Sequence, residues 1–369
     1  MEHTTPSAPT TSRRESGSGT GPPNRGRSRG PGPGRAPGTA RLLHGLTRPE
    51  PWKRAPVLTA LALLLGLAML LHAQIPNRVW HLGSLAESAL PWFALPVPLL
   101  LTAALWRRSA SATLALLLPV TVWLQMFGGL LSDKSHPGGD LTVVEQNVDA
   151  DNPDPVGTAR DLAASHANLL ALVELTPQSL GGYETELAKT YPYHEVRGTV
   201  GLWSTLPLSA AQPIDVMDYG PLGTSRPTGS DADENRALRT TVTTARGPLT
   251  VYVAHLGSVR VYPGAGFWTV SRDIGVQALA GAVAADPGER VVLLGDLNGA
   301  TDDRALAGLT SRLHSAQESA GAGFGFSYPA SFPVVRIDHV LVRGLTPRSA
   351  RVLPATGSDH LPVAAALDW

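Results

Sequence analysis

The nine residues RVVLLGDLN, at positions 290–298, join an apolar run to a polar pair. Residues 291–294 are all apolar, which is typical of a strand buried on both faces. Side chains of a strand alternate between its faces, so Asp296 and Asn298 are expected on the same face. A carboxylate beside an amide can hold a water molecule and a phosphate oxygen, but this short sequence equally suits an Asx turn.

Six further polar residues are placed in the same way, each ending or interrupting an apolar run. Strand ends meet at one edge of a sheet, so their side chains can form a site on a rigid scaffold. Taken singly each residue suits a structural role, but the repeated placement indicates a functional site. The residues are Asn147 in LTVVEQNV, Glu174 in ANLLALVEL, His255 in LTVYVAHL, Asp338 in VVRIDHVLV, and Asp359 and His360 in GSDHLPVAA.

The chemistry of these residue types suits a metal-assisted reaction. Glu174 places a carboxylate in an apolar run, which is costly to bury unless the carboxylate is paired or binds a metal. A hard cation such as Mg²⁺ takes oxygen ligands and keeps several waters, so one or two carboxylates suffice. Asp338 and His360 can form a carboxylate–imidazole pair, in which the carboxylate fixes the ring tautomer.

The ordered series of motifs resembles the endonuclease/exonuclease/phosphatase family, the DNase-I-like superfamily. The motifs are VVEQNV, LLALVEL, GLWSTLPL, VAHLG, LLGDLN, RIDHVLV and GSDHLPV, spread over about residues 140–369. The resemblance implies a four-layer α/β/β/α sandwich. It also implies a hydrolase of phosphoester bonds that uses a divalent metal, Mg²⁺ foremost and Mn²⁺ as an alternative.

The resemblance also implies a role for each of the eight residues. Glu174 is the main metal ligand, and Asp359 lies near the metal. In the implied catalytic set, Asn147 orients the phosphate or the catalytic Asp, and His255 contacts the phosphate or aids protonation of the leaving group. Asp296 positions or deprotonates the water, and Asn298 stabilises the transition state. Asp338 pairs with the last His, which is His360, a general base or phosphate-stabilising group.

Several positions differ from the family pattern or stay outside the expected site. Gln146, Val173 and Leu297 replace the residues usual beside the catalytic positions, but none of these changes removes a catalytic group. His339 alternates away from Asp338 and is expected on the opposite face of its strand. The loop GAGFGFSYPASFP, residues 321–333, suits either a substrate rim or a plain surface connection. Three histidines, His166, His194 and His314, are expected at the surface.

The N-terminal third has a different composition. Residues 1–54 are rich in Pro, Gly, Ser, Thr and Arg, and are expected to be a disordered basic tail. Three apolar stretches follow, at 55–75, 85–106 and 110–131, each near the ~20 residues that cross a bilayer. They predict three transmembrane helices within residues 55–131. The second stretch contains Glu87 and several prolines, which leaves a re-entrant segment open.

Charge sets the expected orientation of these helices. Residues 1–56 hold ten Lys/Arg and three Asp/Glu, a net of +7, and Arg107 and Arg108 lie between the second and third stretches. Basic segments stay cytoplasmic, so three crossings place the linker 132–140 and the catalytic domain 141–369 outside the cell membrane. The layout resembles membrane proteins of the VanJ/StaP type from this superfamily, which confer teicoplanin resistance.

Composition narrows the function further. The chain has no Cys, which excludes disulfides, thiolate metal sites and a Cys nucleophile. Residues 133–369 hold 17 Lys/Arg and 26 Asp/Glu, a net of −9, which disfavours binding to a nucleic-acid backbone. The expected function is a membrane-anchored extracytoplasmic phosphoesterase acting on a lipid-linked substrate. An extracellular nuclease and a non-catalytic envelope scaffold with the same fold are the alternatives.

Overall fold

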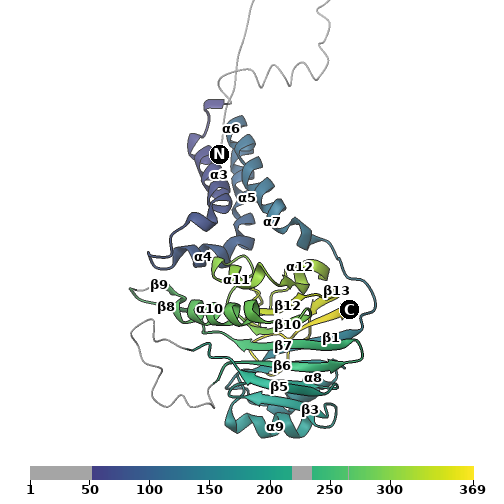
Figure 1. The fold of residues 1–369 in the computed structure, drawn as a ribbon. Coiled ribbons are helices and arrows are strands. Elements are labelled where there is room, and N and C mark those ends of the chain that lie inside the picture. Colours follow the sequence, from purple (N-terminus) through teal and green to yellow (C-terminus); the bar gives the residue numbers. More distant parts are fainter. Residues whose placement is uncertain (1–51, 218–234, 265) are drawn as a thin grey trace, which may run out of the picture. The chain divides into compact units, whose positions relative to one another are not determined.

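The structure is a computed structural model that describes residues 52–217, 235–264 and 266–369 of the chain (Figure 1). These residues belong to one compact unit, Glu50–Trp369. The predicted disordered tail, residues 1–54, lies almost entirely outside the described residues.

Two six-stranded sheets form the body of the C-terminal part (Figure 1). A separate two-stranded ribbon consists of β8 (Arg260–Tyr262) and β9 (Gly266–Trp268). The first sheet has the order β13 (Thr346–Val352), β14 (Val363–Asp368), β1 (Leu141–Asn147), β2 (Leu169–Val173), β4 (Val200–Ser204) and β3 (Tyr193–Arg197). The second has the order β11 (His314–Ser315), β12 (Asp338–Arg343), β10 (Val291–Asp296), β7 (Gly247–His255), β6 (Ala237–Thr244) and β5 (Leu208–Pro213).

The buried residues divide into layers that follow the two sheets. One core, which includes Val143 and Val292, lies between the sheets. A second packs α8 (Pro155–Ala163) and α9 (Pro177–Leu187) on the outer face of the first sheet. A third packs α10 (Val270–Ala285) and the short α11 (Ala307–Thr310) on the second. The predicted α/β fold is confirmed, and its layers run helix, sheet, sheet, helix.

Strand register brings the polar strand ends together. β10 is buried along its whole length, because β7 pairs with it in parallel on one side and β12 antiparallel on the other. In this register Asp296 lies opposite His255 on β7 and opposite Asp338 on β12. Asn147 and Glu174 meet at the corresponding end of the first sheet, where β1 and β2 run parallel and Asn147 pairs with Val173.

Residues 55–131 form helices rather than three uniform spans. The elements are α3 (Pro56–Leu70), η1 (His72–Gln74), α4 (Leu82–Ala89), η2 (Leu90–Ala94), α5 (Pro96–Trp106), α6 (Ala110–Ala115), α7 (Leu117–Phe127) and η3 (Gly128–Leu131). In the described part of the chain, Ala110–Leu131 is long and apolar enough to cross a membrane. Two further helices, η6 (Arg304–Leu306) and α12 (Ala316–Ala320), lie in the sandwich.

The prediction of three transmembrane helices is therefore not confirmed. α3 has 15 residues, fewer than the ~20 that span a bilayer. The second stretch bends by 53° between Leu82–Ala94 and Pro96–Trp106, so it is either one broken span or a re-entrant segment. Prolines at 91 and 96 explain the break, because proline lacks the N–H that continues a helix.

Candidate active site

Asp296 lies at the centre of a cluster of polar side chains at the ends of the strands. Its carboxylate accepts hydrogen bonds from Asn147 Nδ2 (3.1 Å, at Oδ2) and from the backbone N–H of Asn298 (2.8 Å, at Oδ1). Burial and then the negative charge of Asp338 raise the pKa of Asp296 to about 7. A carboxylate with this pKa can accept a proton near neutral pH.

Asp338 and His360 form the pair expected from the sequence. Nδ1 of His360 lies 2.9 Å from Oδ2 and 3.1 Å from Oδ1 of Asp338, and Ser327 Oγ donates to Oδ2 at 2.5 Å. Burial acts to lower the pKa of His360, but the carboxylates of Asp338, Asp296 and Asp359 raise it to about 9. The ring is therefore a cation at neutral pH, with its Nε2 3.9 Å from Asp296 Oδ2.

The stretch GSDH is fixed to the end of β1 by two hydrogen bonds, and a third lies within the stretch. Ser358 Oγ donates to the backbone oxygen of Asn147 (2.7 Å) and accepts from the N–H of His360 (3.0 Å). Gln146 Nε2 donates to the backbone oxygen of His360 at 2.9 Å. Gln146 departs from the family pattern, yet in this chain it holds the catalytic turn in place.

His255 faces both Glu174 and Asp296. Its Nε2 lies 3.3 Å from Glu174 Oε1 and 3.9 Å from Asp296 Oδ2. Within the described residues neither ring nitrogen makes a hydrogen bond, although the side chain is buried. Burial, with the nearby positive charges of Arg236 and His360, lowers the pKa of His255 to about 3. The ring of His255 is therefore neutral.

Glu174 occupies a strained position directly after β2. Its backbone φ is 64°, a left-handed conformation that is uncommon for a residue other than glycine and often marks a functional site. Its Oε2 accepts from the N–H of Ala150 at 3.2 Å, and its side chain is 27% exposed. One face of the carboxylate is thus open to a ligand.

Asp149 belongs to this cluster, although the sequence analysis did not single it out. Burial raises the pKa of Asp359, the charge of His360 lowers it, and the negative charges of Asp149 and Glu174 raise it, so both carboxylates act on Asp359 electrostatically. Asp149 also has a positive φ, 62°. The signal in the sequence was weak: Asp149 follows Asn147 by two residues, beyond the end of the strand.

These three carboxylates fit a divalent cation. In residues 52–217, 235–264 and 266–369, no Lys or Arg lies within ion-pair distance of Asp149, Glu174 or Asp359. The protonated ring of His360 lies 4.0 Å from Asp359 Oδ1 and offsets part of this negative charge. An all-oxygen set of carboxylates suits a hard ion such as Mg²⁺ or Mn²⁺.

A second possible ligand set lies deeper, at Asp296, Asp338 and His360, whose ligand atoms are within 4.8 Å of one another. Asp338 there already accepts from both Ser327 and His360 Nδ1. Asp338 is therefore less available to a cation than Glu174, whose carboxylate has an open face.

Asn298 is held in place by hydrogen bonds, one of which comes from a buried ion pair behind the site. Its φ is 50°, its Nδ2 donates to the backbone oxygen of Leu256 (3.0 Å), and its own backbone oxygen accepts from Arg272 Nη1 (3.1 Å). Arg272 is fully buried and pairs with Asp303 at 2.7 Å. The second N–H of the Asn298 amide remains available for a substrate oxygen.

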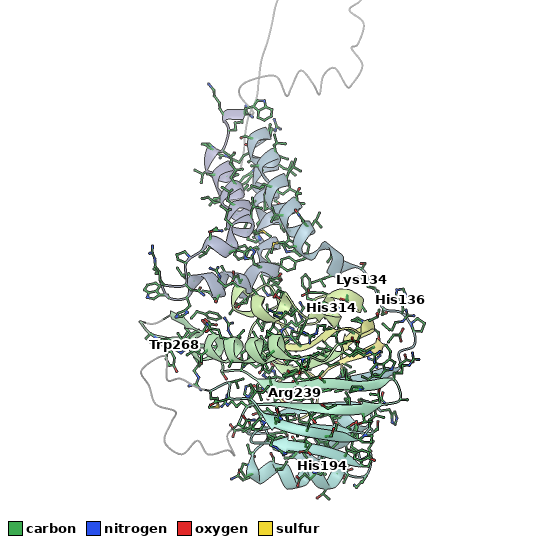
Figure 2. The ribbon with its side chains drawn as sticks, in the orientation of Figure 1. Lys134, His136, His194, Arg239, Trp268 and His314 are labelled. Carbon is green, nitrogen blue, oxygen red and sulfur yellow. The ribbon has the colours of Figure 1, made fainter. Side chains whose placement is uncertain are left out.

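Other polar residues lie outside the cluster or beneath it. His339 is buried on the opposite face, as predicted, with its Nε2 2.8 Å from the backbone oxygen of Gly299. Three other histidines are exposed, also as predicted: His166, His194 and His314 (Figure 2 labels the last two).

Glu145 lies fully buried below the site. Within the described residues its two oxygens have no hydrogen-bond partner. Burial, with the charges of Asp338 and Asp296, raises the pKa of Glu145 well above its usual value.

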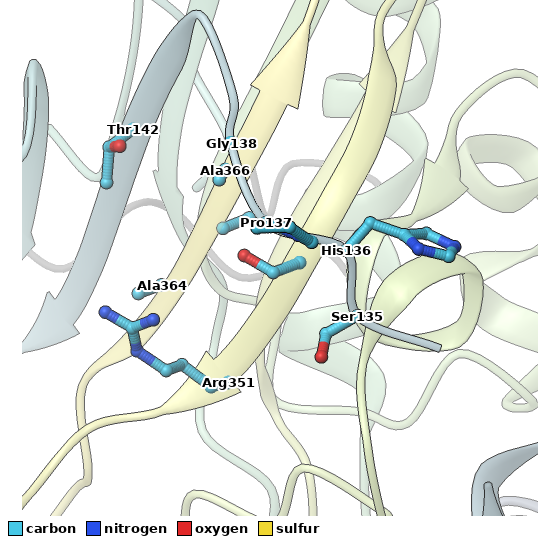
Figure 3. Close-up of a pocket in the computed structure, with 10 residues that line it drawn as sticks. Ser135, His136, Pro137, Gly138, Thr142, Arg351, Ala364 and Ala366 are labelled. Carbon is cyan, nitrogen blue, oxygen red and sulfur yellow. The ribbon is translucent and has the colours of Figure 1, made fainter. Parts of the chain in front are cut away.

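A cavity of about 520 Å³ lies away from these residues, between the linker and the strands β1, β13 and β14 (Figure 3). His136, Thr142 and Arg351 are among the residues that line it. None of the polar strand ends described above contributes to this cavity, so it does not belong to the candidate active site.

The fold and the site together define a class of protein. Two packed sheets with an Asp–His pair, an Asn–Asp pair and an open carboxylate at their strand ends are the arrangement of a metal-dependent phosphoesterase. The sequence model of the Endonuclease/Exonuclease/phosphatase family matches residues 144–360, and the chain belongs to that family. It is therefore a hydrolase of phosphoester bonds.

Several solved structures are similar to the chain. Humanised TDP2 from D. rerio is 18% identical, with 62% of this chain and 99% of that chain covered and a TM-score of 0.50. The mannosyl-6-phosphatase Bt3783 of Bacteroides thetaiotaomicron is 15% identical, with 62% and 100% covered and a TM-score of 0.49. A beta toxin variant from Staphylococcus aureus with bound magnesium ions is 16% identical, with 62% and 99% covered and a TM-score of 0.46. No curated protein sequence matches the chain.

Proposed function

We propose that the chain is a membrane-anchored, extracytoplasmic hydrolase that uses Mg²⁺ or Mn²⁺ to cleave a phosphoester or pyrophosphate bond of a lipid-linked substrate. One observation carries this proposal: two different parts of the chain lie side by side. A catalytic cluster at the strand ends lies beside a helical region, residues 52–131, that exposes apolar side chains. The acidic charge of residues 133–369 favours such a substrate over nucleic acid.

The cluster supports an in-line attack of water on phosphorus. Asp296 orients the water and accepts its proton as the new P–O bond forms and the bond to the leaving oxygen breaks. Protonated His360, held by Asp338, stabilises the negative charge on the phosphate or donates its proton to the leaving oxygen. The neutral ring of His255 and the amides of Asn147 and Asn298 contact the remaining phosphate oxygens.

A divalent cation held by Glu174, with Asp149 and Asp359 beside it, supplies Lewis-acid stabilisation of phosphate charge when bound. The side chain of Glu174 keeps an open face, and the Ala150 N–H fixes its orientation. Holding Glu174 in a left-handed backbone conformation keeps its carboxylate directed at that face rather than into the core.

Exposed apolar surface supports membrane association. Most of the large hydrophobic side chains exposed in the described residues belong to residues 52–131, among them Leu64 (63%), Leu99 (73%) and Trp106 (86%). Soluble surfaces rarely carry such contiguous apolar patches. We propose that α3, α5 and the continuous helix Ala110–Leu131 enter the bilayer, while α4 lies at its surface.

Basic residues support the orientation. Ser109 Oγ donates to the backbone oxygen of Arg54 at 2.6 Å, so Lys53, Arg54, Arg107 and Arg108 lie at one end of the helices. Glu87, on α4 at the other end, contacts the sandwich. The positive-inside rule then favours a cytoplasmic N-terminus and an extracytoplasmic catalytic domain over residues 141–369, with 132–140 as linker.

A substrate panel tests the proposal. The full chain in detergent is assayed with a polyprenyl pyrophosphate, a phospholipid, an inositol phosphate and DNA, each with and without EDTA. We expect metal-dependent hydrolysis of a lipid-linked phosphate. Glu174→Ala and His360→Ala should each lower turnover by about 10²- to 10⁴-fold, while Glu184→Ala, an exposed carboxylate, should not. Preferred cleavage of DNA would favour the nuclease, and no turnover of any phosphoester would favour the scaffold.

A further inference from the structure

A groove of about 340 Å³ adjoins the active site, between α4–η2 and the loops of the second sheet. The volume lies at the lower end of the range for ligand pockets, roughly 300–1,000 Å³. The lining is mainly apolar. It includes Leu85, Ala89, Trp92, Phe267, Val335 and Ile337.

The groove is a built feature of the fold, because α4 and η2 are fixed to the sandwich. Glu87 is fully buried and accepts from Arg304 Nε at 2.9 Å and 3.1 Å. Trp92 Nε1 donates to the backbone oxygen of Val334 at 2.9 Å. The Trp92 ring also stacks on Phe326, with centroids 5.5 Å apart. These contacts hold the two walls together.

One end of the groove is the catalytic cluster itself. Asn298 and Gly299 contribute to its lining, and so does Tyr328, whose ring centroid lies 4.6 Å from that of His360. A phosphate bound at the cluster would therefore have apolar surface directly beside it. Ser88, a polar residue of the lining, donates its hydroxyl to the backbone oxygen of Ser84 at 2.9 Å and is thereby satisfied.

The other end continues into the helical region. Leu85 on α4 is 43% exposed, and the chain runs on from η2 through the exposed Leu95 into α5, which exposes Leu99. Figure 1 shows α4 at the base of the helices, where it also contacts η6 and β9. An apolar path thus connects Asn298 with the surface that we assign to the bilayer.

We propose that this groove binds the hydrocarbon chain of a substrate in which a single chain is esterified directly to the phosphate. The inference rests on the proposed function and specifies the substrate of the same site. A glycerophospholipid places a polar glycerol unit and two acyl chains next to its phosphate, whereas the groove is mainly apolar and its volume of about 340 Å³ suits one chain better than two. An alkyl or prenyl phosphate places methylene groups there, and their burial favours binding.

The experiment compares matched substrates in the full chain, in one detergent. Methyl 4-nitrophenyl phosphate and dodecyl 4-nitrophenyl phosphate differ in chain length and release the same 4-nitrophenolate. A diacylglycerol 4-nitrophenyl phosphate is the third arm. We expect kcat/KM to be about tenfold or more higher for the dodecyl ester than for the methyl or diacylglycerol esters.

Variants separate groove binding from partition into micelles. Ala89→Phe fills the groove, and its long-chain to methyl ratio of kcat/KM should fall towards one. Ala86→Phe makes the same substitution on the same helix at a residue that does not line the groove, and should keep the wild-type ratio. Leu85→Asn, at a partly exposed position, should lower the ratio without requiring the core to repack.

The outcomes distinguish this inference from the proposed function. Equal kcat/KM for the dodecyl and methyl esters, or an unchanged ratio in Ala89→Phe, overturns the groove assignment and leaves the phosphoesterase intact. Preference for the diacylglycerol ester overturns the single-chain assignment. Absence of metal-dependent hydrolysis of every ester counts against the proposed function itself.

Discussion

Replacing Glu87 with Gln is expected to release α4 from the catalytic domain. Glu87 has no exposed side-chain surface, and Arg304 is 30% exposed. The Arg304 guanidinium contacts both oxygens of the carboxylate, with Nη2 2.8 Å from Oε1, and donates to the backbone oxygens of Ile75 and His72 at 2.8 Å each. Gln keeps the shape of Glu but removes the charge, so Arg304 loses its counter-ion in a largely buried place.

The free-energy cost of the Glu87→Gln substitution follows from that burial. Removing one partner of a buried ion pair costs about 3–5 kcal/mol, mainly because the other charge is left uncompensated. The substitution lowers the free energy needed to open α4 locally away from residues 299–306, and it does not lower the free energy of unfolding of the sandwich. Amide protection in α4 should therefore drop by about 10²- to 4 × 10³-fold, since 1.4 kcal/mol corresponds to a factor of ten.

Hydrogen exchange of the full chain in detergent, read by mass spectrometry, measures this change. Glu184→Gln is the matched control, because Glu184 pairs with His194 at 3.7 Å with about two fifths of each side chain exposed. Exposed pairs contribute little, so its protection should not change. The double variant Glu87→Gln/Arg304→Met should recover part of the loss. Unchanged protection of α4 in Glu87→Gln would refute the reasoning.

Three further predictions concern the catalytic cluster. Asp149→Asn should raise the metal concentration needed for half-maximal activity by about 10- to 100-fold, whereas Asp151→Asn should not, and equal effects would remove Asp149 from the metal site. The pH profile of kcat/KM should rise through about 7 as Asp296 loses its proton and fall through about 9 as His360 loses its own; a bound cation moves the acidic limb lower. Asp338→Asn removes the charge that raises the pKa of His360, so the alkaline limb should move to lower pH; an unmoved limb would assign it to another group.

Much of the sandwich could be predicted from the sequence, because its central strands are continuous apolar runs. β1, β2, β4, β6, β7, β10, β12 and β14 lie where such runs occur. The edge strands β3 and β5 were missed because they alternate with exposed polar residues and carry no apolar run. Residues 302–314 hold η6, the short α11 and the start of β11 rather than one continuous helix, and Asp303 caps η6.

The candidate site was predictable residue by residue but not as a geometry. The placement of polar residues at strand ends located Asp296, Asp338 and His360, and strand register then joined them. Asp149 was missed because it lies past the strand, where the alternation of faces no longer applies. Glu87 could be recognised as unusual in an apolar stretch, but its partner Arg304 lies 217 residues away and only the fold brings them together.

The loop 321–333 shows how the two parts of the chain act on one site. Phe324, Phe326 and Tyr328 alternate along it. Phe324 packs against Trp123 and Phe127 on α7, both at 6.1 Å between ring centroids, Phe326 stacks on Trp92 of η2, and Tyr328 lies against His360. The sequence left this loop open between a substrate rim and a plain connection. Its aromatic rings connect the apolar helices to His360, which supports the proposal that the site acts on a membrane-borne phosphate.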